Sequence, residues 1–131
     1  MNTKICTDIE QSEKLIEFGI DVNTADMCHR FRWSNDSFIL LPCAEKAREP
    51  ITDDIPAWSL SALLKLMPFQ IMRNKNRYGI SFWKGHNREG DTYCYEYISN
   101  NELKLHKTKH RNNPVDAAFE MICWLKENNK L

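Results

Sequence analysis

Seven residues in the second half of the chain, Thr92–Ile98, alternate between tyrosine and other side chains. Successive side chains of a β-strand point to opposite faces of its sheet, so a period of two is typical of a strand with two different faces. We therefore expect a strand here, with the tyrosines on one face and residues such as Cys94 and Glu96 on the other.

Segments on either side of this stretch also have the composition of short strands separated by turn residues. Phe69–Arg73 and Tyr78–Trp83 flank residues 74–77, which we expect to form a four-residue hairpin loop. Residues 84–91 contain two glycines and predict a second turn, and residues 103–106 alternate between leucine and basic side chains. Together these segments predict a meander of antiparallel strands.

Two more short strands are expected nearer the N-terminus, at Met27–Arg32 and Phe38–Leu41. Residues 42–54, PCAEKAREPITDD, have the most loop-like composition in the chain. They are too few to link two domains, and we expect them to form a surface loop.

Three segments have the apolar spacing and end signals that are typical of helices, and they lie near residues 8–18, 59–67 and 114–128. At the first, Thr7 and Glu10 fit a capping box, and Gly19 supplies a left-handed stop. At the third, Asn113 is a suitable N-cap and Pro114 occupies the first helical position.

The second helix lies in the stretch IPAWSLSALLKLMP, where Ser59 is the expected N-cap and Pro68 prevents continuation. Its apolar stripe consists of Leu60, Leu63, Leu64 and Met67. Trp58 precedes the cap, and we expect it to pack and so hold the chain where it enters the helix. The alternative is that Trp58 lines a ligand pocket beside the helix N-terminus.

These elements follow the order helix, two strands, helix, three or four strands, helix. The simplest arrangement is an α+β fold, with an antiparallel sheet of about five to six strands and three helices packed mainly on one face. A chain of 131 residues is expected to form a single globular domain, residues 1–131.

Several classes of protein are disfavoured by the composition. No run of 18 apolar residues is present, and the polar start lacks the apolar core of a signal peptide, so we expect a cytoplasmic protein outside the membrane. The five cysteines are odd in number and widely spaced, which predicts reduced thiols. Neither a metal motif nor a phosphate-binding glycine loop is present, and we expect no cofactor and no metal.

Three stretches, TDIEQSEKLIEFGIDVNTADM, IPAWSLSALLKLMP and NPVDAAFEMICWLKENN, together cover roughly two fifths of the chain. As a set they resemble a group of small uncharacterised proteins found in gut Bacteroidales, their phages and their mobile elements. The resemblance implies a cytoplasmic accessory protein of phage or mobile-element origin. The group has no assigned activity, so the resemblance carries over no catalytic residues.

Basic residues are concentrated in the middle of a chain whose net charge is zero. Residues 1–72 carry seven Lys and Arg against eleven Asp and Glu, whereas residues 73–111 carry nine against four, a net charge of +5. Basic groups neutralise phosphates and aromatic faces accept stacked bases, so this segment is a candidate site for a small anionic ligand such as a nucleotide. The candidate anion-binding residues are Arg73, Lys75, Arg77, Lys104, Lys107, Lys109 and Arg111. The candidate stacking residues are Trp83, Tyr93, Tyr95 and Tyr97.

The same residues have a structural interpretation, in which the lysines solvate exposed strands and the tyrosines pack beneath the helices. A neutral protein also lacks the strongly basic surface of most nucleic-acid-binding proteins, so nucleic acid is not an expected partner. A small anionic ligand needs only a local group of basic residues.

A second class of function is suggested by the stretch LHKTKHRNN, in which His106 and Thr108 form a single His-x-Thr. One class of phosphoesterases uses two such motifs, but His29 and His86 are not followed by a second one. A phosphoesterase-like enzyme using His106 and Thr108 is therefore an alternative that needs another histidine brought close by the fold.

The leading hypothesis is a non-enzymatic accessory binding protein that engages a host factor or sequesters a small anionic, nucleotide-like ligand. The third possibility is a protein–protein interaction module acting as a homo-oligomer, because the last helix is apolar around much of its circumference. A homodimer is the commonest form of such an assembly.

Overall fold

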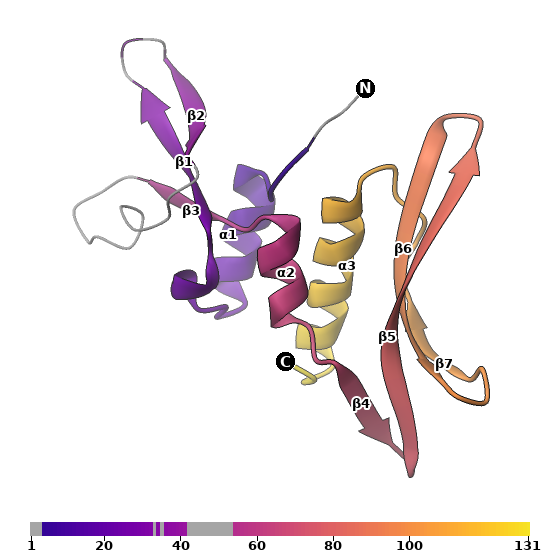
Figure 1. Ribbon diagram of the computed structural model, residues 1–131. Helices are drawn as coiled ribbons and strands as arrows, with labels where there is room; N and C mark the ends of the chain where they lie inside the picture. The colour runs from indigo at the N-terminus through magenta and orange to yellow at the C-terminus, as the bar shows by residue number, and fades with distance from the viewer. Residues whose placement is uncertain (1–3, 33, 35, 42–53) are drawn as a thin grey trace. The chain divides into compact units, whose positions relative to one another are not determined.

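The computed structural model of the chain describes residues 4–32, 34, 36–41 and 54–131 (Figure 1). Within these residues it contains three α-helices and seven β-strands in two antiparallel sheets, which confirms the α+β class. None of the helices in the described part combines the length and the apolar composition that crossing a membrane requires.

The described residues divide into two compact units. Residues 5–62 form the N-terminal unit, and residues 63–131, together with Lys4, form the C-terminal unit. The expectation of one sheet is wrong, because three strands pair within the N-terminal unit and four within the C-terminal unit.

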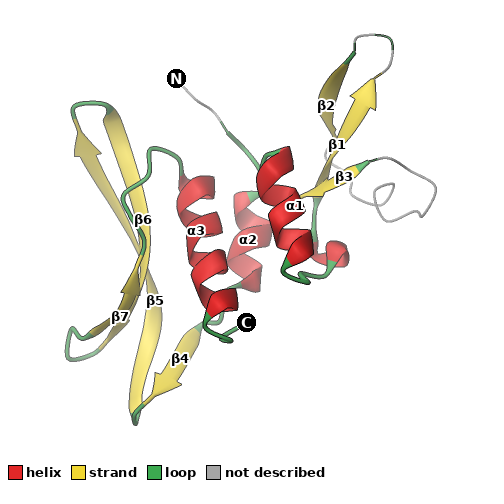
Figure 2. Cartoon of the chain, turned by 180° about the vertical axis from the view of Figure 1, so that it is seen from behind, coloured by secondary structure: helices red, strands yellow, loops and turns green. Residues whose placement is uncertain are grey.

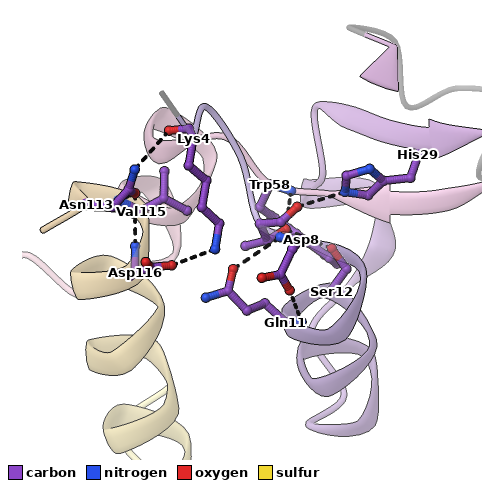
Figure 3. Close-up of polar contacts among 10 residues, drawn as sticks. Lys4, Asp8, Gln11, Ser12, His29, Trp58, Asn113, Val115 and Asp116 are labelled. Carbon is purple, nitrogen blue, oxygen red and sulfur yellow. Dashed lines mark hydrogen bonds and ion pairs between the residues drawn. The ribbon is translucent and has the colours of Figure 1, made fainter. Parts of the chain in front are cut away.

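The first predicted helix is present as α1, Ile9–Glu17, but its cap differs from the prediction. Asp8 is the N-cap: its carboxylate accepts the backbone N–H of Gln11 at 2.8 Å, and the Gln11 side chain accepts the N–H of Asp8 at 3.1 Å (Figure 3). Thr7, the predicted N-cap, lies one residue before the actual cap. Its buried hydroxyl does not cap the helix but makes a hydrogen bond with the Ser12 hydroxyl, at 2.8 Å. Gly19, at φ 83°, is the left-handed residue after the helix, as predicted.

The three-stranded sheet of the N-terminal unit consists of β1 (Met27–Arg32), β2 (Ser37–Leu41) and β3 (Ile55–Ala57), in the order β2-β1-β3. The first two strands were predicted, whereas β3 was not, because it is short and contains Pro56. A proline donates no backbone hydrogen bond and is tolerated on an edge strand, which is where β3 lies. The predicted loop at residues 42–54 lies, except for Asp54, outside the described residues.

Trp58 follows β3 and is fully buried, with 0% of its surface exposed. Its backbone N–H donates to the Thr7 hydroxyl at 3.0 Å, its carbonyl accepts the Thr7 N–H at 2.9 Å, and its indole N–H donates to the Thr24 hydroxyl at 2.9 Å. These contacts confirm that Trp58 has a packing role within the N-terminal unit.

The second helix is α2, Leu60–Leu66, and Ser59 begins it as predicted. The Ser59 hydroxyl accepts the N–H of Ala62 at 3.2 Å, and the Ser59 N–H donates to Asp26 at 2.9 Å. The helix therefore starts from a hydroxyl cap that a neighbouring carboxylate holds in place.

The four-stranded sheet of the C-terminal unit is a curled half-barrel, and its long β5–β6 hairpin is seen clearly from behind in Figure 2. Its strands, in the order β4-β5-β6-β7, are β4 (Gln70–Arg73), β5 (Asn76–Asn87), β6 (Gly90–Ser99) and β7 (Lys104–Lys107).

Both predicted turns of this sheet are shorter than expected. The β4–β5 loop contains only Asn74 and Lys75, whose φ angles of 51° and 68° suit a tight hairpin. The predicted turn at residues 84–91 is mostly strand, with Lys84 paired with Tyr93 and Gly85 with Thr92. A Cβ at Gly85 would lie 2.9 Å from the Thr92 hydroxyl oxygen, so this glycine permits a close strand pair and does not mark a turn.

The third helix, α3, spans Pro114–Glu127 and packs against β6. Asn113 caps it, as predicted: its side-chain oxygen accepts the N–H of Val115 at 2.8 Å, and its amide donates to the carbonyl of Lys4 at 3.4 Å (Figure 3). The Lys4 ammonium lies 2.6 Å from Asp116 in the first turn. The start of α3 is therefore connected to the residue that precedes the N-terminal unit.

Candidate functional site on the four-stranded sheet

The two faces of the four-stranded sheet differ in what covers them. Ile80 on β5, Tyr97 on β6 and His106 on β7 are directly opposite one another across the sheet and therefore share a face. The His106 ring stacks on Trp124 of α3, with ring centroids 4.4 Å apart, so α3 covers this face, which we call the helix face. The alternate residues, among them Glu96, lie on the opposite side, which we call the open face.

A β-bulge brings two lysines to the open face. Glu96 is opposite Lys107, whereas Ile98, two residues along β6, is opposite Lys104, three residues back along β7. The extra residue in β7 is Leu105. Without it, Lys104 and Lys107 would point to opposite faces, because their separation in sequence is odd.

The open face carries a hollow of about 370 Å³. It is lined by Trp83, Glu96, Ile98, Glu102, Lys104 and Lys107. The Trp83 side chain is half exposed, at 52%. Gly79 is directly opposite Ile98, and a Cβ at this position would have no atom within 4 Å. Because glycine has no side chain, this part of the open face is left unfilled. The hollow therefore combines an accessible aromatic ring with two ammonium groups.

Glu96 is buried in the hollow, with 1% of its surface exposed. Its Oε1 accepts the indole N–H of Trp83, which holds the ring in place. Its Oε2 is buried and makes no hydrogen bond within the described residues. The ammonium of Lys104 lies 3.7 Å from this oxygen, which is an ion pair beyond hydrogen-bonding distance.

The thiol of Cys94 lies on the open face beside these charges, opposite Trp83. Burial raises its pKa, while Lys107 acts to lower it and Glu96 acts to raise it. The imidazole Nε2 of His110 lies 4.0 Å from the sulfur. A buried thiol with a raised pKa is protonated at neutral pH, so Cys94 is poorly suited to act as a nucleophile.

The structure brings only part of the predicted basic group together. Lys104 and Lys107 line the hollow, and Arg77 shares the open face with them by its register on β5. Lys75 occupies the tip of the β4–β5 hairpin. Arg73 is opposite Asn76 in the strand pair, so it lies on the other face of the sheet from Arg77. These two residues are therefore not part of the same group.

The remaining two basic residues lie after β7, beside α3. The guanidinium of Arg111 pairs with the carboxylate of Glu120, which also accepts the backbone N–H of Lys109 at 2.6 Å. Arg111 is thus held against α3 by an ion pair, and neither residue lines the hollow.

Of the four aromatic residues expected to stack, the structure places only Trp83 at the hollow. Tyr95 and Tyr97 are on the helix face, where they are 4% and 0% exposed, and Tyr97 donates its hydroxyl to the carbonyl of Pro68 at 2.8 Å. Burial raises the pKa of both phenols. Tyr93 stacks on Phe82, with centroids 6.0 Å apart. The alternation along β6 separates all three tyrosines from the lysines of the hollow.

His106 and Thr108 are held by contacts within the C-terminal unit. The Thr108 hydroxyl accepts the N–H of Tyr95 at 3.0 Å and the Thr108 N–H donates to the Tyr95 carbonyl at 2.9 Å, while His106 stacks on Trp124. Among the described residues, no group of three or more His, Cys, Asp or Glu side chains is arranged to hold a metal ion.

The His106 ring gives the folded state a pH dependence. Burial lowers the pKa of His106, and Glu120 partly opposes this shift. The unfolded chain therefore takes up this proton at higher pH than the folded chain does. The corresponding stability is present above the ordinary histidine pKa of about 6.5 and is lost as the pH falls through the folded value.

We expect the free energy of unfolding to fall between pH 7.5 and pH 5.5, and His106→Phe to reduce this slope, because phenylalanine keeps a stacking ring that does not titrate. Urea denaturation at several pH values measures the slope. The control variant is His86→Phe, at an exposed histidine. An equal slope in the native protein and in His106→Phe would exclude His106 as a source of the pH dependence.

Three residues of the hollow were not among the predicted site residues: Glu96, Ile98 and Glu102. A signal for Glu96 was present in the sequence, because a lone acidic residue in the middle of a buried strand needs a partner. Glu102 follows β6 in the β6–β7 turn, at φ 63°, and only the fold shows that it faces the hollow.

Comparisons with protein-family models, with curated proteins and with solved structures find no match to this chain.

Proposed function

We propose that this protein works by binding, and that it holds a small anionic, nucleotide-like ligand in the hollow on the open face. The observation that carries the proposal is the half-exposed Trp83 ring in one hollow with the ammonium groups of Lys104 and Lys107. An aromatic face stacks on a base, and ammonium groups neutralise a phosphate. The proposal also includes the accessory role that the resemblance implies, and sequestration of the ligand, which is suggested by the basic segment 73–111.

The size of the hollow supports a small ligand. Ligand pockets in proteins commonly have volumes of roughly 300–1,000 Å³. The hollow, at about 370 Å³, is near the lower limit and suits a mononucleotide better than a long polymer. Trp83 is also restrained by its hydrogen bond to Glu96, so little of its freedom remains to be lost on stacking.

The hollow holds two ammonium groups and two carboxylates, and one of these carboxylates, Glu102, is exposed. Glu96 is buried and directs Oε1 to Trp83, whereas Lys107 is exposed and makes no ion pair with any residue that the structure describes. Lys104 pairs with Glu96 only at 3.7 Å, and its side chain is 53% exposed. Arg77 adds a third cation on the same face. A phosphate therefore finds in Lys107 a cation that gives up no ion pair with a described residue by turning to it.

The test is a calorimetric titration with 5′-GMP, 5′-AMP and inorganic phosphate. Replacing Lys104 and Lys107 by alanine together is expected to weaken nucleotide binding by about tenfold to a hundredfold, since two charge-assisted contacts are lost. The affinity of the native protein should fall with added salt, and that of the variant should fall less steeply. Trp83→Ala should weaken nucleotide binding while leaving that of inorganic phosphate unchanged.

A charge-matched control is the double variant Lys65→Ala with Lys109→Ala, since both lysines are exposed and lie outside the hollow. It should bind nucleotides as the native protein does. Failure of the native protein to bind any of these compounds, or an equal loss in both double variants, would contradict the proposal. Native mass spectrometry of gently purified protein would then show whether a host protein or a second copy of the chain is bound instead.

A further inference from the structure

The buried carboxylate of Glu96 has a capacity to accept hydrogen bonds that the protein leaves unused. An ionised carboxylate has about four lone-pair sites on its two oxygens. One is used by the indole N–H of Trp83, on Oε1, and Oε2 accepts no hydrogen bond from the described residues. A buried polar atom without a hydrogen bond is costly, so a natural structure that retains one calls for an explanation.

A ligand that carries a hydrogen-bond donor would satisfy this oxygen. Lys104 is the nearest cation, but its ammonium lies 3.7 Å from Oε2 and its side chain is more than half exposed. When the phosphate of a ligand takes Lys104 as its partner, Oε2 loses that ion pair and needs a donor, and Glu96 lines the hollow that the ligand occupies. The ligand that suits this site carries N–H donors at one end and a phosphate at the other.

We infer that Glu96 recognises the base of the ligand, and that the ligand is a guanine nucleotide. Guanine presents two neighbouring N–H donors, from N1 and the 2-amino group, to a carboxylate. Adenine presents an acceptor, N1, beside its amino group, which places a lone pair against the carboxylate. This inference rests on the proposed function, since Trp83 must stack on the base and Lys107 must hold the phosphate for Glu96 to reach the base edge.

The inference is tested by comparing 5′-GMP, 5′-IMP and 5′-AMP on the native protein. Inosine monophosphate keeps the N1–H donor and lacks the 2-amino group. GMP is expected to bind roughly tenfold or more tightly than AMP, with IMP between them, because each donor to a charged acceptor is worth about one order of magnitude. Equal affinity for GMP, IMP and AMP would overturn the inference.

Glu96→Gln separates recognition of the base from binding of the phosphate. Glutamine has nearly the same shape, but one of its polar atoms is a donor. The GMP preference over AMP is expected to shrink to less than about threefold or to reverse, because the amide NH2 opposes the N–H donors of guanine and can donate to N1 of adenine. Glu89→Gln, the same change at an exposed acidic residue outside the hollow, is the control and should keep the preference.

The outcomes distinguish the two proposals. If the native protein binds GMP and AMP equally and both are weakened by the Lys104 and Lys107 replacements, the binding function stands and recognition of guanine is refuted. If no nucleotide binds, both fail. A preference for GMP that survives Glu96→Gln would assign recognition of the base to another residue and overturn the role of Glu96. Should Glu96→Gln fail to fold, the GMP, IMP and AMP series on the native protein still decides whether guanine is preferred.

Discussion

Replacing Trp58 with alanine is expected to lower the free energy of unfolding by about 3–5 kcal/mol, the range typical of removing a large aromatic side chain from a core. Trp58 is fully buried, and its indole N–H donates to Thr24. The variant would create a cavity and leave the Thr24 hydroxyl without that donor. Alanine keeps the two backbone hydrogen bonds between residue 58 and Thr7, so the expected loss comes from the side chain alone.

Urea denaturation followed by circular dichroism measures this effect. Phe69→Ala is a matched control, because this ring is 82% exposed and its removal should change stability by less than about 0.5 kcal/mol. Trp58→Phe should fall between the native protein and Trp58→Ala, since it retains most of the volume and loses the indole donor. A Trp58→Ala variant as stable as Phe69→Ala would refute the packing role.

Replacing Asp54 with alanine is expected to lower the free energy of unfolding by about 2–3 kcal/mol, because it breaks a largely buried ion pair. The Asp54 side chain is 4% exposed and accepts two hydrogen bonds from the Arg30 guanidinium, at 2.9 and 2.7 Å. The thiol of Cys28 also donates to it, at 3.9 Å. The Arg30 side chain is 30% exposed and can regain some water, which keeps the loss below that of a fully buried pair.

The control for Asp54 is Asp91→Ala, which removes an exposed pairing partner of Lys84 and His86. Exposed ion pairs contribute little to stability because solvent screens them, so this variant should remain close to the native protein. Asp54→Asn should be destabilised nearly as much as Asp54→Ala, since an amide nitrogen would face the guanidinium. If both changes at Asp54 cost no more than Asp91→Ala, the buried pair does not stabilise the three-stranded sheet.

The helices were predictable because their signals are local. Asn113 caps α3, Gly19 follows α1 with a positive φ, and Ser59 begins α2, each as expected from its neighbours in sequence. The cap of α1 was misplaced by one residue because Thr7 and Asp8 are both good caps. The choice depended on Ser12 and Trp58, which engage the Thr7 hydroxyl.

The strands were predictable as segments but their pairing was not. Pairing depends on backbone hydrogen bonds between distant residues, which a period of two does not specify. β3 is three residues long with Pro56 in its centre, and it pairs with β1, 26 to 30 residues earlier. The division of the strands into two sheets followed from such pairings.

By itself the sequence determined the α+β class, the three helices, the alternation along β6 and the concentration of basic residues between 73 and 111. These follow from propensity, caps and spacing, which act within a few residues. Only the tertiary structure decided which of those basic residues meet. The bulge at Leu105 puts Lys104 and Lys107 on the face that carries Trp83 and Glu96, while the tyrosines turn toward α3. A single extra residue reverses the face of every side chain beyond it, and no local pattern in the sequence reports where that residue lies.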